Sequence, residues 1–412
     1  MKKLKLKDTF VLFFAVFFLL ASMQASGEVF EFRHVAGARY RIISVVDQAV
    51  FINDILSHRG ETLYRIVVEV LDVKDGVGTH RAVFQTLDRI MLDTIQHINE
   101  TTSIYQLEKE YESVFDRDRL GRLTIGPQYY MPVVRNVPTF PDRELRVGDR
   151  WFSEAHEVHD FRDSFGILEP YRIPFNAFYE YLGERQWKGE NYPAFSINYN
   201  IESRPARVPG WIYPVRISGT FNQIVYWDRE NGQERAYTET FRVIFDMSDG
   251  VRYEFRGTGE AEYVEAEYMD KEQLITDIIE EINRLEIPDV HVTVVDEGIS
   301  ISLENIRFYA DTDIMLPGEQ EKLEIIADIL LRYPDRDILV SGHAAPLGTR
   351  EYLLRLSQDR ARAVANFLIS RNVRTPDRIM TRGYGADRPI ADNSTEEGMS
   401  RNRRVEITIL EN

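Results

Sequence analysis

The pattern of apolar and polar residues divides the chain into regions of different predicted structure. Residues 28–135 contain β-branched runs such as residues 64–73 (YRIVVEVLDV), which end at a Lys-Asp-Gly turn. Residues 115–123 have the composition of a hairpin tip, whereas residues 87–98 are compatible with a helix, although their apolar period is ambiguous. We therefore predict that residues 28–135 form a β-rich domain, for which the sequence gives no function.

A second β-rich block follows at residues 136–268, after the prolines at positions 132 and 138. Runs such as residues 220–227 (TFNQIVYW) are rich in aromatic and β-branched residues, and Asn-Gly and Asp-Gly turn sequences separate them. We expect the dense aromatic side chains to pack inside a sandwich or a barrel-like domain rather than to form a surface that stacks on a ligand. The prediction is thus two successive β-rich domains.

The apolar period changes to that of a helix at residues 269–286. Leu274, Ile278 and Ile282 recur on one face of this segment, so it is predicted to be an amphipathic linker helix that packs on one neighbour. In residues 287–412, strand-like runs alternate with helical segments. That order predicts an α/β domain in which helices pack on one face of a small mixed sheet.

The first 27 residues differ from all of these regions. Lysines precede the unbroken apolar run at residues 10–21 (FVLFFAVFFLLA), and small residues follow it at 25–27. This order is typical of a bacterial secretory signal peptide, and the run is shorter than the ~20 residues of a spanning helix. We expect residues 1–27 to be cleaved rather than kept as an anchor, so that no membrane-spanning segment remains. The predicted location is periplasmic, with or without outer-membrane association, in a diderm bacterium.

Composition and missing motifs exclude several kinds of function. The 412-residue chain has no cysteine, so it can hold no disulfide, thiolate metal site, cysteine nucleophile or lipid-bearing cysteine. Its formal net charge of −17 argues against nucleic acid as a partner. No metalloprotease motif and no nucleophile elbow occurs in the sequence, so we predict a non-enzymatic protein without a metal or a cofactor. His343 is expected to stabilise a turn, because no second ligand stands at metal-binding spacing.

A series of short motifs occupies the last third of the chain. They are Gly-His at 342–343, Leu-Ser-x-x-Arg-Ala at 356–361, Gly-Tyr-Gly at 383–385, Pro-x-Ala-x-Asn-x-Thr at 389–395 and Asn-Arg-Arg-Val-Glu at 402–406. With these motifs in this order, residues 294–410 resemble the OmpA-like C-terminal domain of the peptidoglycan-binding type. The resemblance implies an α/β domain that binds the stem peptide of peptidoglycan non-covalently. Such domains tether the outer membrane or an envelope assembly to the wall.

The resemblance also implies candidate binding residues. Arg360 falls on the arginine that grips a carboxylate of the diamino acid through charge-assisted hydrogen bonds. Arg403 matches the closing Asn-Arg-Arg motif. Asp311 is a candidate for supplying a carboxylate that the family motif provides elsewhere, as are Asp313 and Glu351.

Four positions depart from the family pattern around the implied ligand. Ala345 replaces the binding Asp, and Ala344 replaces a Thr. Leu353 stands where an Asn is common, and Met399 replaces an Arg. Loss of one charged hydrogen-bond partner typically costs ~1.5–3 kcal/mol, which is roughly a tenfold to hundredfold loss of affinity. The pocket is therefore predicted to be degenerate, or to be matched to a stem peptide of different chemistry.

Two hypotheses about function follow. In the first, the protein is a cell-envelope protein that associates with peptidoglycan in the periplasm, or tethers the outer membrane to it, through this degenerate pocket. In the alternative, the domain no longer binds peptidoglycan, and the protein is a periplasmic scaffold for protein contacts or for ligand binding. Envelope proteins are expected partners in both cases, whereas an enzyme in residues 28–268 is not favoured by any motif.

Overall fold

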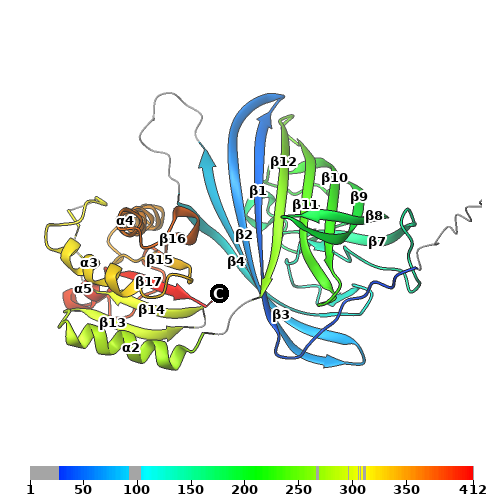
Figure 1. The fold of residues 1–412 in the computed structure, drawn as a ribbon. Helices are drawn as coiled ribbons and strands as arrows, with labels where there is room; N and C mark the ends of the chain where they lie inside the picture. Colours follow the sequence, from blue (N-terminus) through cyan, green and yellow to red (C-terminus); the bar gives the residue numbers. More distant parts are fainter. Residues whose placement is uncertain are drawn as a thin grey trace, which may run out of the picture.

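The computed structural model describes residues 27–91, 104–265, 269–295, 297–304, 306, 308–309 and 312–411. Apart from Gly27, the predicted signal peptide therefore lies outside the described residues. The described chain forms a large curved β-sheet followed by an α/β domain, which lie side by side in Figure 1. None of the helices in this described part has the length and the apolar character needed to cross a lipid bilayer.

In the residues that the structure describes, the N-terminal part has twelve strands and one short helix. They are β1 (Arg39–Ile52), β2 (Ile55–Lys74), β3 (Val77–Met91), β4 (Tyr105–Arg117), β5 (Leu123–Ile125), β6 (Val134–Arg135), β7 (Arg150–His159), α1 (Arg162–Phe165), β8 (Tyr171–Trp187), β9 (Glu190–Ser203), β10 (Pro214–Asp228), β11 (Gln233–Met247) and β12 (Arg252–Glu265).

These strands pair into one continuous antiparallel sheet, in the order β5-β4-β3-β2-β1-β12-β11-β10-β9-β8-β7-β6. β1 pairs with β12 along its whole length, from Tyr40 opposite Glu265 to Ile52 opposite Tyr253. The predicted boundary between residues 135 and 136 thus does not separate two sheets. An unpaired strand edge leaves backbone N–H and C=O groups without partners, so pairing with another edge is favourable. Here the first strand pairs with the last.

The local predictions for this region have mixed outcomes. The strand at residues 64–73 lies within β2, and the hairpin tip at residues 115–123 joins β4 to β5, so both predictions are confirmed. The helix at residues 87–98 is wrong for its first part, because β3 runs to Met91, and its remainder lies outside the described residues.

The C-terminal part is an α/β domain. Its elements are α2 (Lys271–Arg284), β13 (Val290–Val295), β14 (Gly298–Leu303), α3 (Glu319–Leu330), β15 (Ile338–Gly342), α4 (Arg350–Ser370), a 3₁₀ turn (Pro376–Arg378), β16 (Ile379–Gly383), α5 (Glu396–Asn402) and β17 (Val405–Leu410). The sheet order is β13-β14-β17-β15-β16, with β15 and β16 parallel and the other pairs antiparallel. The predicted small mixed sheet is confirmed.

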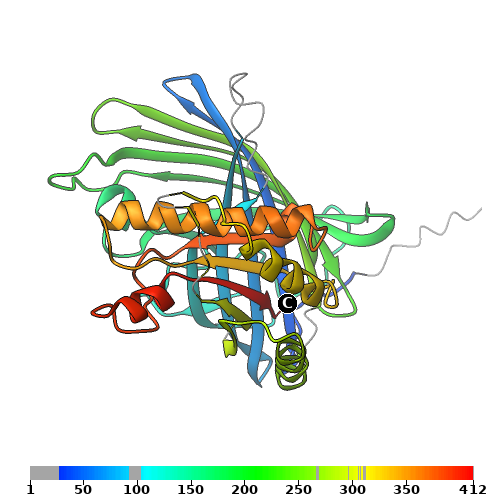
Figure 2. The ribbon, with the colours of Figure 1, turned by 90° about the vertical axis from the view of Figure 1, so that its left-hand side faces the viewer.

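Helices α2, α3 and α4 cover one face of this sheet. Their apolar residues form a single core with the inward residues of β14, β15, β16 and β17, including Ile278, Leu323 and Val364, each of which is buried. The helix predicted at residues 269–286 is α2, and its buried face packs into the core of the α/β domain. In Figure 2, α3 and α4 lie in front of the sheet and the strands of the N-terminal part lie behind it.

The opposite face of the α/β sheet packs against the outer side of the N-terminal sheet. Leu339 of β15, Met380 of β16 and Leu410 of β17 form one apolar cluster with residues of β1 to β4. β16 also pairs in parallel with the start of β4, where Met380 lies opposite Tyr105. The two parts therefore share a core, and β4 continues the edge of the α/β sheet.

Candidate functional site

The family motifs form a rigid frame where β15 and β16 end against α4. A Cβ atom on Gly342 would lie 2.0 Å from the carbonyl oxygen of Ser357, and one on Gly383 would lie 2.6 Å from that of Leu354. Only glycine allows the strands to approach the helix this closely. Ser357 Oγ donates to Leu354 O at 2.9 Å and accepts from the Gly385 amide at 2.9 Å. The Gly-His, Leu-Ser and Gly-Tyr-Gly motifs are thus explained by packing.

The loop that carries the two alanines is fixed by backbone hydrogen bonds. The His343 amide donates to Arg404 O at 3.0 Å, and the Ala344 amide donates to Gly385 O at 2.7 Å. Ala344 and Ala345 are both buried, at 6% and 3% exposure. The backbone of the loop is therefore held in place, and the loop presents no side-chain acceptor at position 345.

Leu353 lies directly beneath this loop. It is buried, and its Cβ atom would lie 3.4 Å from a Cβ atom built on Gly385. An apolar side chain here fills the space under the turn, whereas an amide would have required polar partners. Ala344 and Leu353 thus both contact Gly385, while Met399 lies half-buried on α5.

Arg360 lies one turn beyond Ser357 on α4. Its Nε donates to the carbonyl oxygen of Thr312 at 3.3 Å, and its guanidinium carbon lies 4.8 Å from the centre of the Phe308 ring. These contacts hold the guanidinium against the segment that precedes α3. Asp311 lies outside the described residues, so its predicted role stays a prediction. Asp313 is exposed.

Arg403 does not join the loop. Its Nη2 donates to Glu396 Oε1 at 2.8 Å, which directs the side chain to the start of α5. The next residue, Arg404, is buried instead beside the His343 loop, and its Nε donates to Glu406 Oε1 at 2.7 Å. Alternation along β17 places Arg404 and Glu406 on one face, and that period was the available sequence signal for this pair.

The buried His343 and Arg404 form a cluster of titratable groups with the half-buried Glu406. Burial lowers the pKa of His343, although Glu406, whose Oε2 lies 3.5 Å from Nε2, opposes the change. Burial would raise the pKa of Glu406, but His343 and Arg404 outweigh it and lower that pKa to about 2. Because a histidine of lowered pKa is neutral near pH 7, Arg404 is the cation that keeps Glu406 ionised there.

Tyr384 completes this side of the domain. Its ring stacks on His343 with centroids 5.2 Å apart, and the guanidinium carbons of Arg388 and Arg382 lie 4.0 and 4.8 Å from the ring centre. The loop is therefore bordered by cations and one aromatic ring, which suits an anionic ligand group. Within the described residues, no group of three or more His, Asp or Glu side chains is arranged to hold a metal ion.

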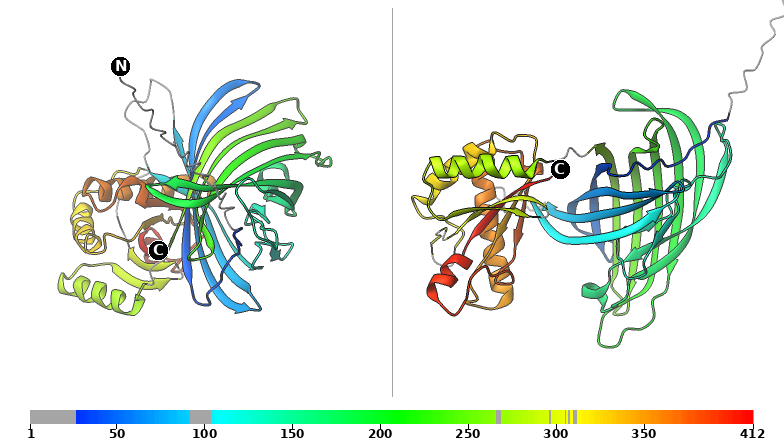
Figure 3. Two further views of the ribbon diagram at one scale, coloured as in Figure 1. Left: turned by 45° about the vertical axis from the view of Figure 1, so that its right-hand side comes forward. Right: turned by 90° about the horizontal axis from the view of Figure 1, so that it is seen from below.

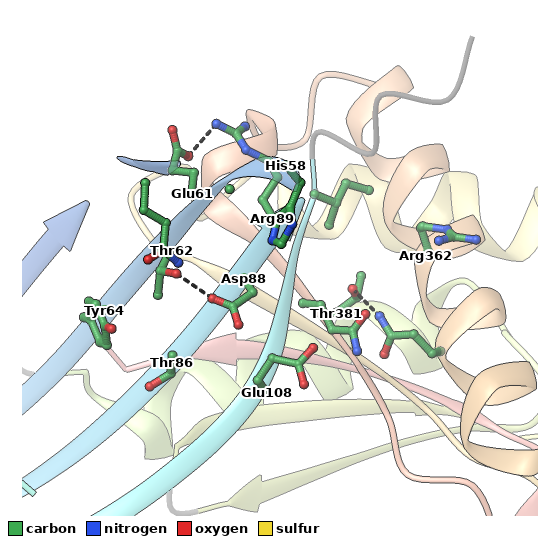
Figure 4. Close-up of a pocket in the computed structure, with 15 residues that line it drawn as sticks. His58, Glu61, Thr62, Tyr64, Thr86, Asp88, Arg89, Glu108, Arg362 and Thr381 are labelled. Atoms are coloured by element: carbon green, nitrogen blue, oxygen red, sulfur yellow. Dashed lines mark hydrogen bonds and ion pairs between the residues drawn. The ribbon is translucent and has the colours of Figure 1, made fainter. Parts of the chain in front are cut away.

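A polar pocket of about 480 Å³ lies between the two parts of the protein. Figure 4 shows residues of β2 and β3 facing Arg362 of α4 and Thr381 of β16. An ion pair joins Glu61 to Arg89, and Thr62 Oγ1 donates to Asp88 Oδ1 at 2.7 Å. These hydrogen-bonding groups of the pocket thus have partners within the protein. The polar side chains of the pocket therefore mainly stabilise the interface between the two parts.

Comparison with known proteins identifies the class of the C-terminal domain. The model of the OmpA family matches residues 307–403. The domain that these residues form therefore belongs to the OmpA family, and the family model leaves the N-terminal sheet uncovered.

Individual proteins match the same part of the chain. The peptidoglycan-associated lipoprotein of Brucella melitensis is 41% identical over 107 residues, which are 26% of this chain and 62% of that protein. The probable lipoprotein YiaD of Escherichia coli is 39% identical over 121 residues, which are 29% and 55% of the two proteins. Outer membrane porin F of Pseudomonas fluorescens is 37% identical over 105 residues, or 26% and 32%. The chain thus spans less than two thirds of the length of each of these relatives.

Proposed function

We propose that the protein is a non-enzymatic cell-envelope protein whose OmpA-like domain associates with peptidoglycan through an altered pocket. Export through residues 1–27 would place it in the periplasm, where it would bind the wall or tether the outer membrane to it. The observation that carries the proposal is the position of Arg360. This arginine is held by Thr312 and Phe308, on the helix that Ser357 locks to the Gly385 turn. The name of the Brucella relative, a peptidoglycan-associated lipoprotein, gives further support.

The altered pocket would bind only one of the two charged groups of a zwitterionic ligand. Arg360 and the cations beside Tyr384 favour a carboxylate, whereas Ala345 offers no acceptor for an ammonium group. A ligand that lacks the ammonium contact would lose roughly tenfold to a hundredfold in affinity relative to a complete pocket. Weak binding with a strong salt dependence is the expected behaviour.

Sedimentation of the purified protein with isolated sacculi, over a salt series, tests this proposal. Arg360→Ala should weaken co-sedimentation by about tenfold or more. The matched control is Arg355→Ala, because Arg355 is exposed on the same helix and should not affect binding. Equal binding by the Arg360→Ala variant and the unmodified protein would refute the proposed role of Arg360.

The alternative, a scaffold without affinity for the wall, is favoured by the burial of the apolar side chains of Ala344, Ala345 and Leu353. Ala345→Asp discriminates between the two functions. Peptidoglycan binding that appears only in the Ala345→Asp variant would mean that the domain has kept its fold but has lost its affinity for peptidoglycan. Binding by the unmodified protein, lost in Arg360→Ala, would favour the first proposal.

A further inference from the structure

The concave side of the N-terminal sheet lines a largely apolar, partly open cavity of about 580 Å³. Alternate residues of each strand face it, so β1 contributes Ile42 and Val46 while β11 contributes Phe241, Val243 and Phe245. Figure 3 shows the strands curving around this side of the sheet. Small-molecule sites typically have volumes of about 300–1,000 Å³ and mainly apolar walls, so the cavity has the size and character of a ligand site.

A second cavity, of about 470 Å³, adjoins one end of the apolar one. The two share four lining residues, Tyr40, Arg117, Glu234 and Tyr263. The remaining walls of the second cavity are mostly polar and include His80. A largely apolar space thus adjoins one with more polar walls, and the half-buried Arg117 lies where the two meet.

The groups at this junction have hydrogen-bonding capacity that the described part of the chain does not use. Arg117 Nε, Glu234 Oε2 and His80 Nδ1 are buried and make no hydrogen bond there. His80 and Glu234 are only 2% and 4% exposed. Arg117 Nη1 lies 3.9 Å from Glu234 Oε2, which is too long for a hydrogen bond. Buried polar groups normally have partners, so these atoms point to a ligand that supplies them.

The charges at the junction favour an anionic partner. Burial by itself would lower the pKa of Arg117, but the charge of Glu234 helps to raise it. Arg117 therefore stays cationic. Burial raises the pKa of Glu234, which shifts that carboxyl toward its neutral form. Burial, with the charge of Arg117, lowers the pKa of His80 to about 3, so this histidine is neutral. Arg117 is thus a permanent cation at the junction, with Glu234 3.9 Å away and a histidine nearby that is neutral near pH 7.

We propose that the N-terminal sheet binds an amphiphile, with an acyl chain in the apolar cavity and a carboxylate or phosphate head at Arg117. Fatty acids and lysophospholipids share this chemistry. The site lies on the concave side of the sheet, whereas the OmpA-like domain packs on the outer side, so this proposal stands apart from peptidoglycan binding.

Isothermal titration of the purified protein with palmitic acid, hexadecanol and a palmitoyl lysophosphatidylglycerol tests the head contact. Palmitic acid should bind at one molecule per chain, and hexadecanol should bind about tenfold or more weakly, because it lacks the charge-assisted hydrogen bonds. Arg117→Gln should remove the difference between the acid and the alcohol. Arg122→Gln is the control, because Arg122 is 63% exposed at the adjacent hairpin, and it should leave the difference intact. Tighter binding of the lysophospholipid than of palmitic acid would identify a phosphate head.

A second pair of variants tests the chain-binding cavity. Val243→Trp should fill the space and weaken all three ligands about tenfold or more, whereas Val215→Trp, at a position 43% exposed, should not. Circular dichroism melting confirms that each variant is folded. The proposal is overturned if the folded, unmodified protein binds neither acid nor lysophospholipid, or if it binds acid and alcohol equally. It is also overturned if Arg117→Gln and Val243→Trp both leave palmitic acid binding unchanged.

Discussion

Met380 of β16 lies opposite Tyr105 of β4 in a parallel strand pair that joins the OmpA-like domain to the N-terminal sheet. Both residues are buried, at 2% and 3% exposure, and both belong to the apolar cluster between the two parts. Thr381 Oγ1 adds a hydrogen bond to Tyr105 O at 3.3 Å. The edge strand β16 of the OmpA-like domain thus pairs with a strand of the same chain. The sheet face opposite the helices is covered by the N-terminal sheet.

Apolar packing at this interface should contribute measurably to stability. Leu339→Ala removes a side chain that is 7% exposed in the shared cluster, and it should lower the free energy of unfolding by about 2–4 kcal/mol. Urea denaturation measures the change. Leu347→Ala, at a position 64% exposed, serves as the control and should stay within about 0.5 kcal/mol. Similar small changes for both variants would mean that the interface does not contribute to folding stability.

Asp337 should be the main electrostatic link between the two parts. Its carboxylate lies 3.6 Å from Arg41 Nη1, 3.8 Å from Arg65 Nε and 2.9 Å from Arg378 Nε. Arg65 is 4% exposed, and burial lowers its pKa to about 10. Asp337→Asn leaves a buried cation with less compensation, so the free energy of unfolding should fall by about 3 kcal/mol.

The control for Asp337→Asn is Asp387→Asn. Asp387 pairs with Arg350 at 2.7 Å, but the two side chains are 44% and 74% exposed, so the loss should be below about 1 kcal/mol. The double variant Arg65→Met with Asp337→Asn, measured in the same urea series, should recover part of the stability. A double variant less stable than Asp337→Asn would contradict the role given to Arg65.

Gly342 should tolerate no side chain. In Gly342→Ala, the new Cβ atom would meet the Ser357 carbonyl oxygen at 2.0 Å, so the strand and α4 must separate. We expect a loss of about 2–3 kcal/mol in the free energy of unfolding, measured by urea denaturation. Gly60→Ala is the matched control, because its Cβ atom would meet only Arg89 O, at 3.8 Å. A Gly342→Ala variant as stable as this control would show that the close contact is relaxed in solution.

Acid should destabilise the fold through Glu406 and His343. The pKa of Glu406 falls from an ordinary 4.5 to about 2 in the folded protein, so its contribution is complete above pH 4.5 and is lost as pH falls toward 2. The contribution is up to about 3 kcal/mol. The lowered pKa of His343 means that the unfolded chain binds the extra proton below about pH 6.5, which also reduces stability in acid.

Thermal melting between pH 2.5 and 8 measures this dependence. Glu406→Gln should flatten the acid limb below pH 4.5, whereas Glu396→Gln, at a side chain 76% exposed, should leave it nearly unchanged. Parallel melting profiles for Glu406→Gln and the unmodified protein would argue against the charged cluster as the source of acid sensitivity.

Sequence motifs were sufficient to predict the OmpA-like domain. Glycine at positions 342, 383 and 385 and serine at 357 are required by short backbone contacts, so the motif itself encodes the geometry. The helical period of Leu274, Ile278 and Ile282 likewise identified α2, because one face of that helix is buried in the core. Such features are local, and local residues encode them.

Features that depend on partner choice could not be predicted in this way. Alternation shows which residues of β1 share a face, but backbone hydrogen bonds are the same for every strand, so it does not show that β12 is the neighbour. For the same reason, the sequence did not predict the contact of β4 with β16 or the cavity on the concave side of the sheet. The ligand-binding role of Arg403 stays a prediction; its side chain pairs with Glu396, whereas the neighbouring Arg404 is buried and pairs with Glu406.

The sequence by itself therefore determined the kind of C-terminal domain and the glycine and serine positions that frame its loop. The tertiary structure alone decided that residues 39–265 form one sheet, that this sheet covers a face of the OmpA-like domain, and that Arg117 lines the apolar cavity on the concave side. The physical reason is that motifs record short-range steric and hydrogen-bonding needs. Strand pairing and enclosed volume arise from contacts between residues far apart in the chain.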